Sequence, residues 1–100
     1  MAWVYVVAQG LRALLYWQAA NYSASAHHAY MASNRPAALV GASSGLPMGV
    51  RPILVGLREA LWVVLKDASD IPYEPQRAKA LLYMSDLYGV LGEALGDEAG

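Results

Sequence analysis

Residues 35–61 read RPAALVGASSGLPMGVRPILVGLREAL, and they carry the strongest signal of secondary structure in the chain. The apolar run 37–40 leads into a loop, 41–49, that holds three glycines, and a helical repeat of apolar residues follows from Leu54. A strand, a glycine-rich turn and a helix form the arrangement by which α/β folds bring a ligand close to backbone N–H groups. Glycine suits such a turn because it adopts positive φ freely and has no Cβ to block a ligand. The stretch therefore favours an α/β fold.

The residues before this stretch predict a second strand. Trp3 to Val7 is rich in β-branched and aromatic residues, and Gly10 follows it, which is typical of a buried parallel strand. We therefore expect parallel strands at 3–8 and 37–41, joined by a helix over 11–33. The alternative is one continuous helix from residue 3 to 33, because periodicity does not separate the two for a short apolar run.

Two further helices are expected after the glycine-rich loop, over 50–67 and 75–95. Pro52 falls in the first turn of the former, where proline is tolerated. The predicted fold class is thus α/β, a βαβ unit with additional C-terminal helices, in one domain over residues 1–100. An all-α helical bundle is the alternative.

The amino-acid composition limits the classes to which this protein can belong. The chain has 100 residues, of which 57% are apolar and 15% charged, against roughly 25% charged in typical soluble chains. Such a chain is expected to hide some surface against a partner, so we expect a homo-oligomer. Cysteine is absent, which excludes disulfides and thiolate metal sites. Residues 2–20 are interrupted by Gln9, Arg12 and Gln18, so we expect no membrane span, no secretory signal and a cytoplasmic location.

Charge is divided unevenly along the chain. Residues 1–58 carry four arginines and no acid, giving +4, whereas residues 59–100 carry eight acids and three basic residues, giving −5. Either the first half is buried and the last helix solvated, or the halves complement each other within a chain or between subunits. Four scattered arginines do not form a basic patch, so no nucleic-acid partner is expected.

Two short motifs carry little chemistry. Residues 41–45 match the GxSxG pattern of α/β-hydrolases with Ser43 as the nucleophile, but a hydrolase needs a histidine after that serine. Both histidines, His27 and His28, precede it.

His27 and His28 are adjacent, so on a helix they point about 100° apart, and no carboxylate occurs before Glu59. We therefore predict no metal site.

Several segments together resemble the later part of the flavodoxin-like NADPH-dependent FMN reductase and quinone reductase family. That family has an apolar strand, a helix beginning LKNAIDW, a GKP sequence before the next strand, and a GASxG-like loop with a glycine-rich bend. The matching segments are WVYVVA at 3–8, LRALLYW at 11–17, NRPAALV at 34–40, GASSG at 41–45, MGVR at 48–51 and Leu57-Arg58. The family's N-terminal strand and its phosphate-binding loop have no counterpart here.

The resemblance implies a partial flavodoxin-like fold and an FMN-dependent NAD(P)H oxidoreductase, or a truncated and inactive relative. Hydride would pass from a nicotinamide to FMN and on to a quinone-like substrate. Four residues of the loop would contact the flavin: Gly41, Ser43, Ser44 and Gly45. No residue is assigned as a general acid or base. The alternative from a different class is a non-catalytic helical protein that acts by oligomerisation or as an adaptor.

Overall fold

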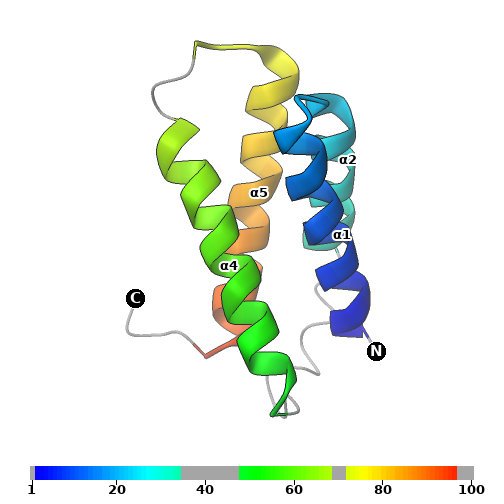
Figure 1. The fold of residues 1–100 in the computed structure, drawn as a ribbon, viewed down its shortest axis with the longest axis vertical. Coiled ribbons are helices and arrows are strands. Elements are labelled where there is room, and N and C mark those ends of the chain that lie inside the picture. Colours follow the sequence, from blue (N-terminus) through cyan, green and yellow to red (C-terminus); the bar gives the residue numbers. More distant parts are fainter. Residues whose placement is uncertain (1, 35–47, 69–71, 97–100) are drawn as a thin grey trace.

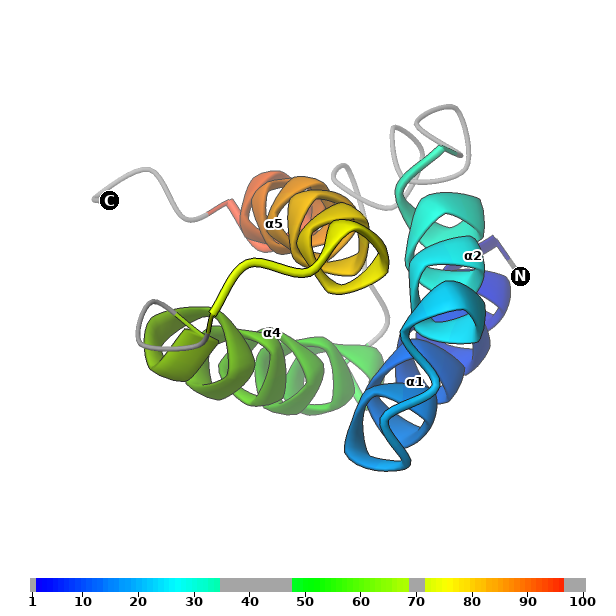
Figure 2. The same cartoon turned by 90° about the horizontal axis from the view of Figure 1, so that it is seen from above.

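The computed structural model describes residues 2–34, 48–68 and 72–96, and within these ranges it contains helices and no strand. The helices are α1 (Ala2–Gln18), α2 (Tyr22–Ser33), α4 (Val50–Asp67) and α5 (Pro75–Ala94). Figure 1 shows α1 and α4 running in one direction along the bundle and α2 and α5 in the other. The view from above (Figure 2) places α1 and α4 on one side, with α2 and α5 on the opposite side.

The α/β prediction is therefore wrong for the described residues, and the all-helical alternative is right. Residues 3–8, expected to be a strand, form the first turns of α1. Gly10 does not end an element but lies inside this helix, where a Cβ would stand 3.0 Å from Leu57 Cδ2 and 3.3 Å from Leu87 Cδ2. The glycine thus lets α1 approach α4 and α5 closely. The second expected strand, 37–41, lies outside the described residues.

The expected helix 11–33 is divided in two by a tight turn. Ala20 has φ +60°, its N–H donates to the Trp17 carbonyl at 3.0 Å, and the Asn21 N–H donates to the Tyr16 carbonyl at 2.9 Å. These are the two hydrogen bonds of a Schellman motif, which usually has glycine at the left-handed position. Asn21 then caps α2, because its Oδ1 accepts a hydrogen bond from the Ala24 N–H at 3.3 Å. The chain reverses direction here with no glycine or proline.

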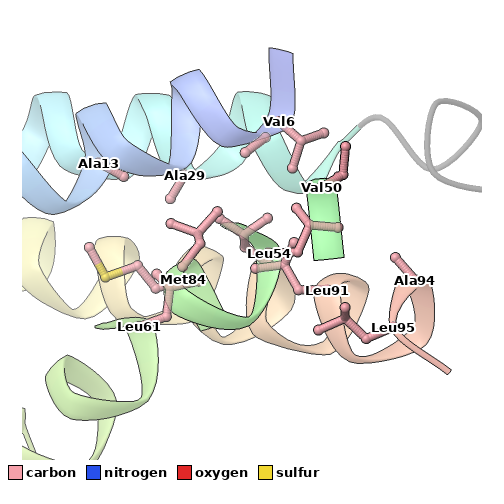
Figure 3. Packing of buried hydrophobic residues seen from close by; sticks show 13 residues of the cluster. Val6, Ala13, Ala29, Val50, Leu54, Leu61, Met84, Leu91, Ala94 and Leu95 are labelled. Atoms are coloured by element: carbon pink, nitrogen blue, oxygen red, sulfur yellow. The ribbon is translucent and has the colours of Figure 1, made fainter. Parts of the chain in front are cut away.

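The core lies between all four helices (Figure 3). α4 and α5 supply its large side chains, among them Leu54, Leu61 and Met84, which are fully buried. α2 supplies only small ones: its buried residues are Ser25, Ala26, Ala29 and Ala32. Small side chains let neighbouring helices approach closely, and the buried Ser25 hydroxyl donates to the Ala13 carbonyl of α1 at 2.7 Å.

The last two helices begin and end close to where the sequence predicts. α5 starts with Pro75 in its first turn, and both carboxylate oxygens of Glu74 cap it: Oε1 accepts from the Gln76 N–H at 3.0 Å and Oε2 from the Arg77 N–H at 2.8 Å. The far end of α5 is held by Arg51 of α4, which donates to the Leu95 carbonyl at 2.5 Å. None of the described helices is long and apolar enough to cross a bilayer.

Candidate functional site: an uncharged apolar face and a cationic pocket

The loop predicted to contact FMN cannot be placed. Gly41, Ser43, Ser44 and Gly45 lie outside the described residues, so their contact with FMN stays a prediction. The interpretation as a flavodoxin-like NADPH-dependent oxidoreductase is wrong, because the described helices leave no place for the parallel sheet that this fold requires.

One feature is an apolar face across α1 and α4, which we call the α1–α4 face. Five large apolar side chains on it are between 41% and 65% exposed, with Leu15 the most exposed. They follow helical spacing together with small residues. The α1 stripe comprises Val4, Ala8, Leu11 and Leu15, and the α4 stripe comprises Ile53, Gly56, Ala60 and Val63. None of these eight residues is polar or charged, so each stripe is apolar along its length.

The two stripes lie on the same side of the bundle. On α1 the core-facing residues are Val6, Gly10 and Ala13, and on α4 they include Leu54 and Leu61. At 100° per residue, the stripes point away from these positions and therefore away from α2 and α5. α1 and α4 are neighbouring helices that approach each other where α4 begins and diverge toward the other end (Figure 2), and both stripes point to the same side of this pair.

The edges of this face carry opposite charge. Arg12, one turn after Ala8, is exposed at the α1 edge and is the only Lys, Arg, Asp or Glu in that helix. At the α4 edge, Glu59 lies one turn before Val63, and Lys66 and Asp67 lie one turn after it. The α1 edge thus has a net charge of +1, from Arg12. The α4 edge has a net charge of −1, from two acids and one lysine.

A second feature is a pocket of about 200 Å³ between α2 and α5, which we call the α2–α5 pocket. Besides Ala26, six polar or aromatic residues line it: Ser23, His27, Tyr30, Gln76, Lys79 and Tyr83. The Tyr30 and Tyr83 rings meet edge to face with centroids 5.0 Å apart and an interplanar angle of 62°. The Tyr30 hydroxyl also accepts a hydrogen bond from Asn34 Nδ2 at 3.2 Å. No carboxylate is among these lining residues.

A third feature joins α1 to α2 at His28. Its Nδ1 lies 2.6 Å from Oε1 of Gln9, and its ring stacks on that of Tyr16 with centroids 5.4 Å apart and planes 5° from parallel. Partial burial, with smaller contributions from neighbouring His27 and Arg12, lowers the pKa of His28. The described residues contain no group of three or more His, Asp or Glu side chains that could hold a metal ion. His28 is therefore best explained as an interhelical contact.

Sequence reasoning missed the first two features for different reasons. The spacing of Val4, Leu11 and Leu15 is visible in the sequence, but treating residues 3–8 as a strand separated Val4 from the others. The α2–α5 pocket joins residues 23–30 to residues 76–83, and no local pattern indicates that these two segments meet.

Comparison with known proteins adds no further assignment. No family model, no curated protein and no solved structure matches this chain.

Proposed function

We propose that this protein is a helical module that functions by self-association, forming a homodimer through the α1–α4 face. The observation that carries the proposal is the row of half-exposed side chains Leu11, Leu15 and Ile53 on a surface without a charge. Large exposed apolar patches on small proteins mark interaction surfaces, because leaving them in water is unfavourable. Burying a fully exposed leucine side chain contributes about 1.5–3 kcal/mol, and several such contacts together help offset the loss of translational and rotational freedom on association.

A second copy of the chain suits this face better than a charged partner. An uncharged apolar face needs an equally apolar surface opposite it, and the chain itself supplies one. In an isologous dimer the same patch is used by both copies. A two-fold axis parallel to the bundle lays α1 of one copy on α4 of the other, and this arrangement brings the Arg12 edge toward the acidic edge near Glu59. The uneven charge of the sequence agrees with this orientation.

Substitution on the face provides the test. Leu15→Glu places a charge in the proposed interface, and we expect it to weaken dimerisation at least about tenfold, which corresponds to about 1.4 kcal/mol. Leu82→Glu is the matched control, because Leu82 is similarly exposed (59% against 65%) but lies on α5, away from α1 and α4. Sedimentation velocity over a concentration series measures both.

The outcomes of this test distinguish association through the α1–α4 face from association through another surface and from a general effect of charge. A dimer that survives Leu15→Glu with wild-type affinity would show that another surface associates, and equal weakening by both variants would show a general effect of added charge. Ile53→Glu repeats the test from α4, and circular dichroism checks that each variant stays helical. If opposite charges at the edges contribute, the dimer also weakens as salt is raised.

A further inference from the structure

The α2–α5 pocket has an ordered arrangement along its length. α2 and α5 run in the same direction (Figure 1), and their lining residues pair at a constant separation of 53 positions: Ser23 with Gln76, Ala26 with Lys79, and Tyr30 with Tyr83. Positions three, four and seven apart share one helix face, so each pair forms one level of the pocket. Hydrogen-bonding side chains thus occupy one end, basic groups the middle and aromatic rings the other end.

The polar part of the pocket suits an anion. Lys79 supplies an ammonium group, His27 an imidazole, and Gln76 and Ser23 an amide and a hydroxyl that donate hydrogen bonds. The described lining residues include no aspartate or glutamate that would neutralise the lysine or repel a negative ligand. A carboxylate accepts hydrogen bonds from all of these donors, and a bond to a charged group is stronger than one between neutral groups.

The other end suits a flat ring. The Tyr30 and Tyr83 rings form an aromatic wall, and a third ring packs on such a pair by stacking or by an edge contact. At about 200 Å³ the pocket is smaller than the roughly 300–1,000 Å³ that holds drug-sized ligands, so a single ring with one short substituent fits its size.

We propose that the α2–α5 pocket binds a small aromatic carboxylate, with the carboxylate on Lys79 and the ring against Tyr30 and Tyr83. This site lies between α2 and α5, whereas the proposed dimer uses α1 and α4, so the inference does not depend on self-association. Binding of a monocyclic acid is expected with a dissociation constant of about a millimolar, given how few atoms it offers for contact.

Benzoate is the probe, and two compounds control for its two parts. Benzyl alcohol has the ring without the charge, and acetate has the charge without the ring. Amide chemical shifts of the ¹⁵N-labelled protein, titrated with each compound, locate binding by residue. We expect benzoate to shift residues 23–30 and 76–83, and the two control compounds to shift them at least about tenfold less at equal concentration, because each lacks one set of contacts.

Lys79→Gln tests the assignment of the charge. It should weaken benzoate binding about tenfold and leave benzyl alcohol unchanged, because a hydrogen bond to a charged group contributes more than one to a neutral amide. The matched control is Lys66→Gln, which changes the other lysine of the chain, on α4. Tyr30→Leu, at a 41% exposed position, should weaken benzoate without unfolding the protein.

The proposal is overturned if millimolar benzoate shifts no residue of the pocket. It is also overturned if acetate shifts the pocket as strongly as benzoate, since the ring would then contribute nothing. Equal loss of benzoate affinity in Lys79→Gln and Lys66→Gln would likewise overturn it, because the effect would come from net charge alone.

Discussion

Gln9 of α1 and His28 of α2 lie 2.6 Å apart between Oε1 and Nδ1, and this contact ties the first two helices together. Since an amide oxygen only accepts, the histidine nitrogen is the donor. Partial burial, followed by the neighbouring His27 and Arg12, lowers the pKa of this ring, which also stacks on Tyr16. The folded chain therefore favours the neutral form of His28.

Stability should depend on pH through His28. Its pKa in the folded chain is lowered, by burial first and by His27 and Arg12 next, whereas the unfolded value is about 6.5. The folded chain thus binds the proton less well than the unfolded chain. The contribution of neutral His28 is present above the unfolded pKa and is lost as pH falls through the folded pKa. Urea denaturation at a series of pH values between about pH 5 and pH 8, where histidine changes its charge, measures this dependence of the free energy of unfolding.

His28→Gln keeps a hydrogen-bonding side chain but removes the titration. We expect the free energy of unfolding of this variant to fall less steeply toward acid than that of the wild type. An unchanged slope would mean that another group causes the pH dependence, and the interhelical assignment of His28 would then fail.

Capping of α5 by Glu74 gives a second pH-dependent contribution. Hydrogen bonds from the Gln76 and Arg77 N–H groups lower the pKa of this carboxyl, so the stabilisation is present above its ordinary pKa and is lost as pH falls through the lowered value. Glu74→Ala should lower the melting temperature at neutral pH, and this difference should shrink in acid. Glu93→Ala is the control at the opposite end of α5, where an acidic group faces the negative end of the helix dipole. A loss of stability in Glu93→Ala equal to that in Glu74→Ala would contradict the capping role.

Ala20 occupies a left-handed position that glycine adopts without strain. Ala20→Gly should therefore raise the free energy of unfolding by about 1 kcal/mol, because the left-handed conformation costs an L-residue roughly that amount. Ala19→Gly, at a neighbouring position without positive φ, should give no gain. Denaturant titration of both variants compares them directly. A destabilised Ala20→Gly would contradict the turn geometry between α1 and α2.

Gly10 and Gly89 both lie within helices but differ in their surroundings. A Cβ at Gly10 meets Leu57 and Leu87, whereas one at Gly89 meets nothing within 4 Å. Gly89→Ala should stabilise by up to about 1 kcal/mol through helix propensity. Gly10→Ala should instead destabilise by about 1 kcal/mol, because Leu57 is buried and cannot move freely. Equal effects of the two substitutions on thermal stability would show that α1 does not pack closely on Leu57.

These positions explain how far the sequence predicts the fold. The sequence predicts α4 and α5 from local patterns: Pro52 falls in the first turn of α4, and a leucine repeat follows Pro75 in α5. The sequence wrongly predicts a strand at residues 3–8, the first turns of α1, because Gly10 resembles a terminator. Only contact with Leu57 and Leu87, far along the chain, makes a glycine necessary there. The turn at Ala20 lacks the glycine that marks most Schellman motifs.

The two candidate sites also differ in whether local sequence or tertiary packing determines them. The α1–α4 face is encoded in spacing and becomes visible once residues 2–18 are known to be helical. The α2–α5 pocket depends on the register between two helices that are separated by some fifty positions, and that register is set by tertiary packing rather than by local pattern.

Self-association through the α1–α4 face can be measured as the weight-average mass of the wild-type chain, by sedimentation equilibrium at micromolar concentration and physiological salt. The α1–α4 face predicts a mass that rises toward twice 10.7 kDa as concentration increases. A mass that stays at 10.7 kDa across the whole series would show that the exposed leucines of α1 remain in water, and it would contradict the proposal that this protein functions by self-association.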